Sequence, residues 1–368
     1  MKVLILSCGT GQGHNSAARA VEEALKRRGI ECQIADPLSF GRRKTAGVVA
    51  AAYNGVIKDA PKAFGVIYKV GDLYSSTRLT SPVYFANTLY AGHLESYILE
   101  NHFTAVICTH LFAMEAVTAL RKRPEFTVPC YGVLTDYTCI PFFAETKLDG
   151  YFIPQEDLRA EMVEKGIPEQ RLYSTGIPVS GRFAHHTAPA AARTALDLPA
   201  DQPIILVMSG GVGCGNLLEL CCELLQYTTK PFTACVMTGR NRKLKGQLDE
   251  HFQGDSRLRT IAFTEKVDQY MNAADVMISK PGGLTSTEAA VANIPLVHLL
   301  AFSGCETKNA AFFSARGLSL QAGSVRAAVE SAWRLINHPE LAEQMRSLQR
   351  TYIAPDAADR IVSKVIGS

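Results

Sequence analysis

The sequence predicts an α/β fold with two domains, each built on a doubly wound, Rossmann-like sheet of parallel strands. Short apolar runs alternate with segments of helical periodicity along the whole chain, which is the pattern of βα units. The chain has 368 residues, of which 47% are hydrophobic. One core rarely grows to that size, so the length favours two domains of similar size.

The N-terminal half begins with the buried run VLILS, followed by a Gly-rich loop and a helix. Asn15 or Ser16 is expected to cap this helix, and Gly29 to end it shortly after residue 28. Apolar runs then predict further strands at 31–35, 104–108, 129–134 and 150–153.

A Pro- and Ala-rich stretch at 176–203 is typical of a linker with a short helix, and a second βα alternation follows it. Its strands are predicted at 204–208, 232–237, 259–263, 275–278 and 295–299. Its helices are predicted at about 215–228, 241–252, 285–293, 305–316, 322–336 and 339–350.

These elements divide the chain into an N-terminal domain at 1–176, a C-terminal domain at 177–355, and a tail at 356–368 that returns to the N-terminal domain. Two doubly wound domains of similar size joined by a linker indicate the GT-B arrangement. In that arrangement the domains face each other across a cleft, and ligands bind near the carboxyl ends of the strands.

Composition excludes several classes of protein. A net charge of +3 is too small to favour nucleic acid as a partner. The ten cysteines show no C-x-x-C pair and no Cys/His ligand spacing, so we expect free thiols and no metal. No apolar run approaches the roughly 18 residues that cross a bilayer, and the first run is too short for a signal peptide. We therefore expect a cytoplasmic protein, either soluble or peripheral to the membrane.

Three Gly-rich loops each join a predicted strand to a helix. The first contains Gly11 and Gly13, and the second contains Ser209, Gly210 and Gly211. The third is Ser279–Glu288, with Gly282, Gly283, Leu284 and Thr285. Glycines let the backbone approach a ligand, and a helix N-terminus offers free N–H groups to an anion. These loops are candidate phosphate sites.

Two side chains are candidates for the catalytic base. His14 stands where the first loop enters its helix, and its pKa lies in the range of a base that takes a proton from an attacking hydroxyl. A histidine that caps or packs the helix is the alternative. Asp136 follows a strand in VLTDY and is expected to lie at the mouth of the cleft, either as a base or as a loop cap. His110 in CTH is a weaker candidate.

The third loop carries the most specific pattern. Its Thr285 hydroxyl and the first-turn amides suit a diphosphate, and Glu288 is placed to accept hydrogen bonds from ribose hydroxyls. The alternative is that the carboxylate of Glu288 only stabilises the helix N-terminus.

The segment KPGGLTSTEAA, followed by NIPLV, resembles the donor site of a glycosyltransferase family. This family includes monogalactosyldiacylglycerol synthases, bacterial processive diacylglycerol glucosyltransferases and, more distantly, the peptidoglycan glucosaminyltransferase. Further blocks resemble the family in the same order along nearly the whole chain: GTGQGHNSAARAVEEAL, ICTHLF, VLTDY, KLDGYFIPQEDLRAEMVEKGIPEQRLYSTGIPVSGRF and TGRNRKLKGQL.

The resemblance implies an inverting transfer of a hexose from a UDP-sugar, without a metal cofactor. It implies that His14 takes part in catalysis and that Gly282, Gly283, Leu284 and Thr285 contact the diphosphate. It also implies that Glu288 binds the ribose, that uracil meets the backbone at Phe263, and that Arg240 lies beside the diphosphate. Glu306 and Asn309, in GCETKN, would hold hexose hydroxyls. The segment 138–143 departs from the family pattern and is expected to shape the acceptor pocket.

Residues 41–93 combine seven Lys and Arg with two Asp and seven interleaved aromatic residues. This composition suits an anionic membrane surface, and the corresponding region of the lipid-modifying relatives is their membrane-facing insert. Ordinary helices that pack their aromatic side chains into the core are the alternative.

The leading hypothesis is a UDP-sugar:diacylglycerol glycosyltransferase at the inner membrane face. Three alternatives stay open: a soluble small-molecule or cell-wall precursor as acceptor, a UDP-sugar 2-epimerase, and a non-catalytic nucleotide-sugar sensor. The sequence does not choose among UDP-hexoses, and it does not indicate the oligomeric state.

Overall fold

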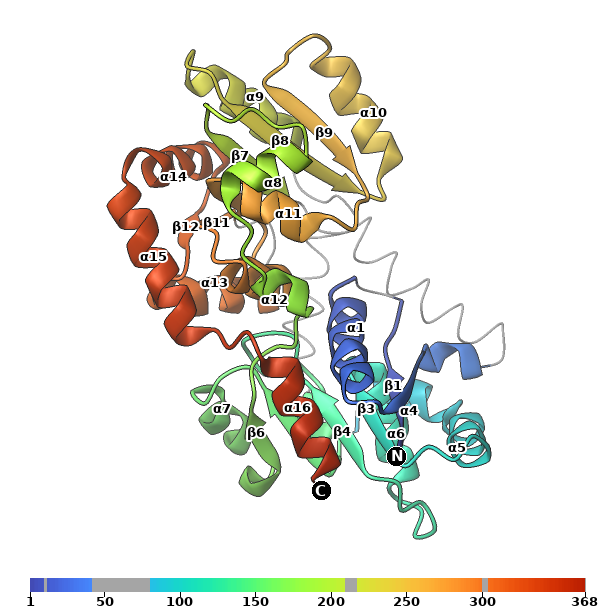
Figure 1. The fold of residues 1–368 in the computed structure, drawn as a ribbon. Helices are drawn as coiled ribbons and strands as arrows, with labels where there is room; N and C mark the ends of the chain where they lie inside the picture. Colours follow the sequence, from blue (N-terminus) through green and yellow to red (C-terminus); the bar gives the residue numbers. More distant parts are fainter. Residues whose placement is uncertain (10–11, 42–79, 209–216, 300–303, 368) are drawn as a thin grey trace. The chain divides into compact units, whose positions relative to one another are not determined.

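The computed structural model describes residues 1–9, 12–41, 80–208, 217–299 and 304–367. The chain divides into two compact units (Figure 1). The first unit contains Met1–Ser180, Phe302–Cys305 and Asp356–Ser368, and the second contains Gly181–Ala301 and Glu306–Pro355. Each unit is built on its own parallel sheet.

The sheet of the first unit has six strands in the order β2-β1-β3-β4-β5-β6, all parallel. Its strands are β1 (Lys2–Leu6), β2 (Glu31–Ala35), β3 (Ala105–Cys108), β4 (Cys130–Val133), β5 (Gly150–Ile153) and β6 (Leu172–Ser174). The chain winds outward in both directions from the β1–β3 pair, so this sheet is doubly wound.

Helices cover both faces of this sheet because alternate side chains of each strand point to opposite faces. Val3 and Ile5 of β1 pack with α1 and α16 on one face, whereas Leu4 and Leu6 pack with α5 and α6 on the other. The helices of the unit are α1 (Gln12–Arg27), η1 (Pro37–Phe40), α4 (Pro82–Thr88), α5 (Ala91–Glu100), α6 (Leu111–Leu120), η2 (Phe143–Glu145), α7 (Leu158–Glu164), η3 (Glu169–Arg171) and α16 (Ala357–Ile366).

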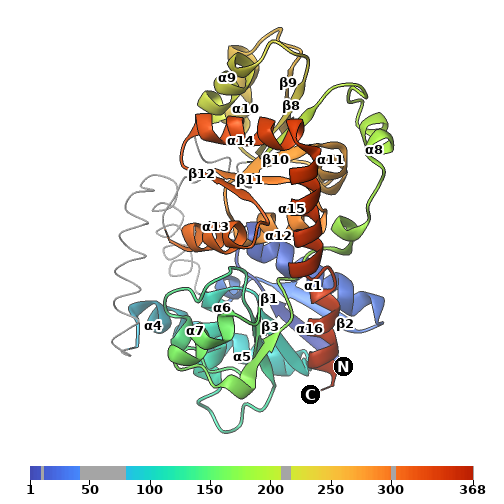
Figure 2. The ribbon, with the colours of Figure 1, turned by 90° about the vertical axis from the view of Figure 1, so that its left-hand side faces the viewer.

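The C-terminal helix α16 belongs to the first unit and lies beside α1 (Figures 1 and 2). Its apolar side chains Ile361, Val362 and Val365 are buried in the core that α1 also contributes to. Arg27 of α1 pairs with Asp359 at 2.8 Å. Two segments more than 300 residues apart in the sequence therefore cover the same face of one sheet.

The second unit contains a sheet of six parallel strands in the order β12-β11-β10-β7-β8-β9. Its strands are β7 (Ile204–Met208), β8 (Thr233–Gly239), β9 (Leu258–Ala262), β10 (Val276–Ser279), β11 (Leu296–Leu299) and β12 (Leu320–Ala322). Its helices are η4 (Gly181–Ala184), α8 (Pro189–Ala195), α9 (Leu217–Tyr227), α10 (Arg242–His251), α11 (Val267–Ala273), α12 (Gly283–Val291), α13 (Cys305–Ala315), α14 (Val325–Asn337) and α15 (Pro339–Tyr352).

Most of the strands and helices that were predicted lie within two or three residues of their predicted ranges. The three-residue strands β6 and β12, at the edges of the two sheets, were not predicted. The helices α4, α5, α6, α7 and α11 were not predicted either. No helix was predicted in the tail at 356–368, which forms α16. Most of the basic and aromatic segment 41–93 lies outside the described residues, which resume at residue 80.

A buried histidine connects three elements of the second unit. His298 of β11 is fully buried, with its Nε2 atom 2.9 Å from Ser286 Oγ of α12 and its Nδ1 atom 3.1 Å from Ser319 Oγ. Burial lowers the pKa of His298 to about 3, so the ring is neutral at physiological pH. This neutral ring ties α12 to the sheet.

We predict that the second unit loses stability as the pH falls below about 6.5. The folded state keeps His298 neutral down to about pH 3, whereas the unfolded chain takes up a proton near the ordinary histidine pKa of about 6.5. The free energy of unfolding should therefore fall by up to about 1.4 kcal/mol per pH unit in this window.

Trp333, the single tryptophan, is buried in α14 of the same unit and reports its unfolding by fluorescence. Urea unfolding at several pH values should show a shallower pH dependence in His298→Asn than in the wild type. Parallel curves for the two proteins would contradict the assignment of this effect to His298.

Candidate active site

The first candidate site lies where the strand order of the first sheet reverses. The chain leaves β1 in one direction and β3 in the other, and ligands of doubly wound sheets bind at this point. His14 lies in the first turn of α1, which follows β1, and Thr109 directly follows β3. The Nδ1 atom of His14 lies 2.8 Å from the carbonyl oxygen of Thr109, so a hydrogen bond joins the two segments.

This contact determines which nitrogen of His14 carries the proton. A carbonyl oxygen can only accept a hydrogen bond, so Nδ1 is protonated and donates. The Thr135 hydroxyl, which follows β4, lies 3.1 Å from the same Nδ1 atom. In return, the Thr109 hydroxyl donates to the carbonyl oxygen of His14 at 3.1 Å. The lone pair of Nε2 is left available to accept a proton.

The surroundings of His14 favour a neutral ring that can be protonated during a reaction. Burial lowers the pKa of His14, and the charge of Asp136 and the hydrogen bond to Thr109 oppose this shift. Asp136 is thus close enough to stabilise an imidazolium. His110, whose ring meets that of His14 edge-on, accepts a hydrogen bond from the Phe112 amide and caps α6. Burial lowers the pKa of His110 as well.

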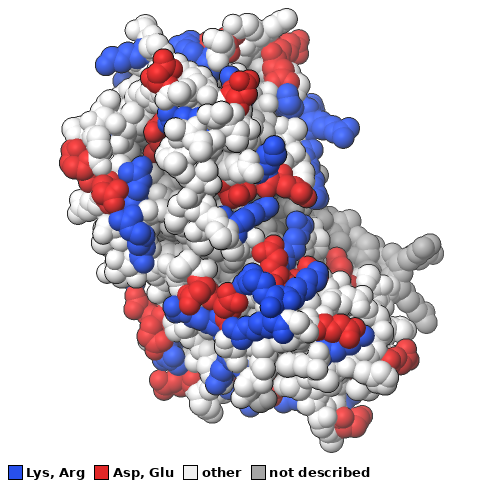
Figure 3. Space-filling view, in the orientation of Figure 1, with Lys and Arg blue, Asp and Glu red and all other residues white. Residues whose placement is uncertain are grey.

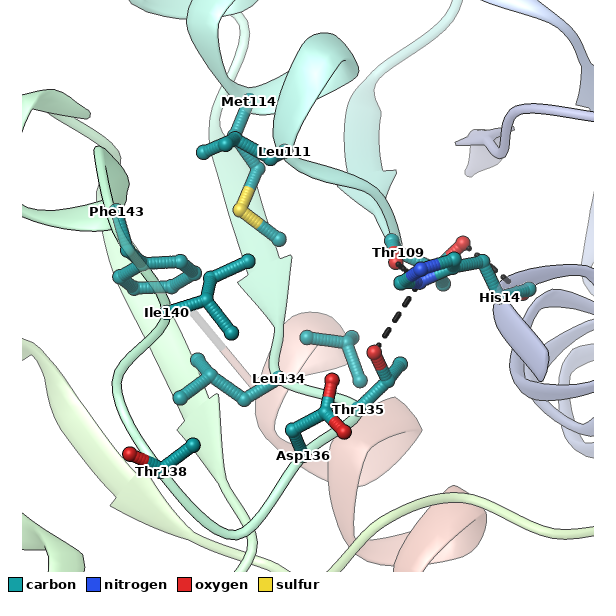
Figure 4. A pocket seen from close by; sticks show the side chains of 11 residues that line it. His14, Thr109, Leu111, Met114, Leu134, Thr135, Asp136, Thr138, Ile140 and Phe143 are labelled. Atoms are coloured by element: carbon teal, nitrogen blue, oxygen red, sulfur yellow. Dashed lines mark hydrogen bonds between the residues drawn. The ribbon is translucent and has the colours of Figure 1, made fainter. Parts of the chain in front are cut away.

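A pocket of about 270 Å³, its open mouth included, lies beside His14 and Asp136. Figure 4 shows the His14 ring on one side and the apolar side chains on the other. These apolar side chains are Leu111, Met114, Leu134, Ile140 and Phe143. Thr138, Ile140 and Phe143 belong to the segment 138–143, so this segment lines the pocket. That the pocket takes the acceptor stays a prediction.

The glycine loop of the first unit is fixed by a carboxylate. Asp36 accepts hydrogen bonds from the amides of Gly9 at 3.1 Å and Leu38 at 2.9 Å. Gly13 lies within the first turn of α1, directly before His14. The predicted residue Gly11 lies outside the described residues.

The second candidate site is at the corresponding reversal in the other sheet, between β7 and β10. The third Gly-rich loop follows β10 and opens α12, with Gly282 as the residue that precedes the helix. Among the residues that the structure describes, no side chain caps this N-terminus, and a Cβ atom at Gly282 would meet no atom within 4 Å. The first-turn amides of a helix have no partner within the helix, so these amides can donate to an anion.

The predicted site residues of this loop differ in which of their atoms a ligand can contact. The side chains of Thr285 and Glu288 are half-buried, whereas that of Leu284 is 6% exposed, so Leu284 can offer a ligand only its backbone. Thr287 donates to the carbonyl oxygen of Gly283 at 2.7 Å and stabilises the first turn. Glu288 lies beyond that turn, which argues against a purely helix-stabilising role.

Burial raises the pKa of Glu288 to about 7, and the positive charge of Arg182 partly opposes this shift. Arg182 belongs to the linker helix η4 and donates to the carbonyl oxygen of Glu265 at 2.9 Å. Sequence reasoning did not identify Arg182 as a neighbour of Glu288, because the two residues are more than 100 positions apart.

Arg240 and Phe263 come together at the ends of two neighbouring strands. Arg240 follows β8 and Phe263 follows β9, and the guanidinium group lies 5.0 Å from the centre of the aromatic ring. Phe263 is 51% exposed, which is unusual for a phenylalanine. Both residues are at the same edge of the sheet as the loop that opens α12.

Glu306 and Asn309 lie one turn apart on α13. Glu306 accepts a hydrogen bond from Lys280 Nζ at 2.5 Å, and Asn309, which is fully buried, donates to the carbonyl oxygen of Pro281 at 3.1 Å. Both contacts attach α13 to the loop after β10.

Three predicted residues of the second Gly-rich loop, Ser209, Gly210 and Gly211, lie outside the described residues. Within the described ranges, no group of three His, Cys, Asp or Glu side chains is arranged to hold a metal ion. The expectation that the reaction needs no metal stays a prediction. Sequence reasoning missed Thr109, Thr135 and Lys280, although all three follow strands at the carboxyl edges of the sheets.

Comparison with known families identifies the enzyme class. Residues 14–179 match the family described as monogalactosyldiacylglycerol (MGDG) synthase, and residues 204–361 match the glycosyltransferase family 28 C-terminal domain. Together the two matches show a glycosyltransferase whose N-terminal part is similar to MGDG synthases and whose C-terminal part is of the family 28 type. The prediction of a UDP-sugar-dependent glycosyltransferase is therefore confirmed.

Relatives of this glycosyltransferase match it over nearly their whole length. The processive diacylglycerol beta-glucosyltransferases of Bacillus mycoides and Bacillus cereus are each 27% identical to it, over 99% of this chain and 93% of the relative. Among solved structures, MurG of Acinetobacter baumannii has a TM-score of 0.67 at 16% identity, with full coverage of both chains. The UDP-GlcNAc 2-epimerase of Neisseria meningitidis has a TM-score of 0.63 at 15% identity, also with full coverage. These likenesses confirm the GT-B fold.

We predict that the neutral ring of His14 in this glycosyltransferase carries its proton on Nδ1. The Thr109 carbonyl accepts only from that tautomer, so ¹⁵N resonances should show a protonated Nδ1 and an unprotonated Nε2 at neutral pH. The ring should titrate below the ordinary histidine pKa of about 6.5, because it is buried. Thr135→Val should leave the tautomer unchanged, since the carbonyl remains. Protonation on Nε2 would show that the site is not arranged as a base.

Proposed function

We propose that this protein transfers a hexose from a UDP-sugar to a diacylglycerol-type lipid, with inversion, at the inner face of the membrane. One observation carries the proposal: the free Nε2 lone pair of His14 belongs to a residue that lines a largely apolar pocket. A base at an apolar pocket suits an acceptor with a reactive hydroxyl and a hydrophobic body. The relatives named as diacylglycerol glucosyltransferases act on such an acceptor.

The proposed reaction is a single displacement. Nε2 of His14 takes the proton of the acceptor hydroxyl while its oxygen attacks the anomeric carbon of the hexose. The bond between that carbon and the diphosphate oxygen breaks, and UDP leaves with the electron pair. Asp136 stabilises the imidazolium that forms, through the same charge that opposes the lowered pKa of His14.

The second unit supplies the donor site in this proposal. The amides of Gly283, Leu284 and Thr285 at the start of α12 bind the diphosphate, with Arg240 as a further positive charge. These groups stabilise the negative charge that grows on UDP, so the proposed reaction uses no metal. Glu288 accepts hydrogen bonds from the ribose, the backbone at Phe263 receives the uracil, and Glu306 binds the hexose. Asn309 already donates to Pro281, so its part is to hold α13 in place.

The lipid acceptor is supported by the chemistry of the pocket. Its largely apolar lining suits the hydrophobic body of a lipid, and His14 and Asp136 lie beside that lining for the reactive hydroxyl. No helix of the described residues has the length and hydropathy that spanning a bilayer requires. Figure 3 shows positive and negative side chains interspersed on the face in view, so the membrane attraction proposed here rests on the basic segment 41–93.

Purified protein should consume a UDP-hexose only when vesicles contain diacylglycerol. We would measure UDP release and glycolipid formation with UDP-glucose, UDP-galactose and UDP-N-acetylglucosamine, using anionic vesicles with and without diacylglycerol. His14→Ala should keep its affinity for UDP while turnover falls by about 10²–10⁴-fold, the usual contribution of a general base.

The other outcomes of this experiment identify the alternatives. Turnover with soluble hydroxyl compounds but not with diacylglycerol would replace the lipid acceptor. Conversion of UDP-N-acetylglucosamine to its 2-epimer without an acceptor would show an epimerase. Binding of UDP without any turnover would indicate a nucleotide-sugar sensor.

We also predict that UDP binds more tightly as the pH rises through 7. Ribose hydroxyls donate to the ionised form of Glu288, and the pKa of about 7 in the free protein means that this form is only half populated at pH 7. Calorimetric titrations between pH 6 and 8 should show an affinity increase that Glu288→Gln lacks. The ionisation of UDP itself affects both proteins equally, so the difference between the two curves isolates Glu288.

Glu288→Ala should weaken UDP binding by about 1–3 kcal/mol, because it removes charge-assisted hydrogen bonds. Unchanged affinity in this variant would contradict the donor-site assignment.

A further inference from the structure

The beginning of α13 is attached to the loop after β10 by two side-chain contacts. Asn309 donates to the carbonyl oxygen of Pro281, and Glu306, one turn earlier on the same face of the helix, accepts from Lys280. Gly304, directly before the helix, has a backbone φ of +103°, a value that residues other than glycine rarely adopt. The helix therefore begins at a fixed place beside the loop that opens α12.

The two carboxylate oxygens of Glu306 are in different situations. Oε1 accepts from Lys280 Nζ at 2.5 Å, and the side chain as a whole is 13% exposed. Oε2 is buried and has no hydrogen-bond partner among the residues that the structure describes. A buried acceptor without a partner costs about 1–3 kcal/mol, so a ligand hydroxyl that donates to Oε2 would recover that free energy.

Lys280 connects this carboxylate with the loop that opens α12. It directly follows β10 and precedes Gly282, the residue before the open N-terminus of α12, by two positions. A hexose attached to a diphosphate at that N-terminus would reach only a short distance beyond it. The ammonium group of Lys280 donates to Glu306, and the Lys280 side chain is 31% exposed, so the pair is partly shielded from water.

We propose that Lys280 is a positioning residue for the sugar of the donor. It holds Oε1 of Glu306 so that Oε2 stays directed at a hydroxyl of the hexose, and it does not bind the diphosphate. This inference rests on the proposed function, because it assumes that a UDP-hexose occupies the second unit. The segment after β10 then has two roles. The amides at the start of α12 bind the diphosphate of the nucleotide, and Lys280 orients Glu306, which recognises the sugar.

This role predicts that a change of Lys280 weakens the binding of a UDP-hexose but not the binding of UDP. In Lys280→Met, Glu306 loses the contact that fixes its rotamer, so the affinity for UDP-glucose should fall about tenfold, the equivalent of one hydrogen bond to a charged group. The affinity for UDP should stay within about twofold, because this ligand has no sugar. In turnover, the KM for the donor should rise more than kcat falls.

The experiment is a calorimetric titration of the full chain with UDP and with UDP-glucose, UDP-galactose and UDP-N-acetylglucosamine. The variants are Lys280→Met, Lys280→Arg, Glu306→Gln and the double variant Lys280→Met/Glu306→Gln. Lys280→Arg should keep most of the sugar-dependent affinity, because arginine can still hold Oε1. The double variant should lose no more than Glu306→Gln alone, since both changes act on one interaction.

Lys308→Met is the matched control, because Lys308 is an exposed lysine on the same helix. It should bind all ligands as the wild type does. Trp333 fluorescence verifies that each variant keeps the second unit folded, and Lys280→Arg with Glu306→Gln still tests the proposal if Lys280→Met does not fold.

Equal losses of UDP and UDP-hexose affinity in Lys280→Met would show that Lys280 binds the diphosphate and would overturn the inference. Unchanged binding of every ligand would overturn it as well. Wild-type protein that binds UDP but gains nothing from any attached hexose would remove the role of Glu306 while leaving the nucleotide site in place. Wild-type protein that binds neither UDP nor a UDP-hexose would instead refute the proposed function, and the inference with it.

Discussion

The hydrogen bond from His14 Nδ1 to the Thr109 carbonyl joins the two segments that leave the first sheet in opposite directions. Parallel strands end at one common edge, so the chain after β1, β3 and β4 must pass close together there. Each of these segments contributes one part of the site: the imidazole, the carbonyl that selects its tautomer, and Thr135 with Asp136. The register of the sheet thus determines which nitrogen of the histidine can accept a proton, and burial keeps the ring neutral until it does so.

In the second unit, too, the segments that follow the parallel strands meet at one edge of the sheet. The N-terminus of α12 and Arg240 lie at this edge and attract an anion, whereas Glu288 and Glu306 lie within the helices α12 and α13. The positive charge of Arg182 acts on the Glu288 carboxylate, and Lys280 forms an ion pair with Glu306. Each of these two carboxylates has a basic neighbour. In the proposed donor complex, the paired charges would limit repulsion between the carboxylates and the diphosphate.

The sequence alone predicted the two sheets, most of their strands and the Gly-rich loop that opens α12, because these features depend on local periodicity and on glycine. It missed β6 and β12, whose three residues carry too little pattern to be recognised and which are strands only because a neighbour pairs with them. It also missed every tertiary pairing of the sites: Thr109 with His14, Arg182 with Glu288, and Lys280 with Glu306. A spacing of 26 to more than 100 residues has no sequence signature. The pKa shifts of His14 and Glu288 were out of reach for the same reason, since burial is a property of the folded chain.

The return of α16 to the first unit has a consequence for how the protein is made. The first unit is not a continuous stretch of chain, because Asp356–Ser368 must close over α1 after the whole second unit has been synthesised. Until then the apolar side chains that pack against Ile361, Val362 and Val365 remain uncovered, while all of the second unit has already been synthesised and can fold. A chain that ends before α16 would contain a folded second unit and a first unit whose apolar face beside α1 is uncovered. Exposed apolar surface of this kind is recognised by chaperones and proteases.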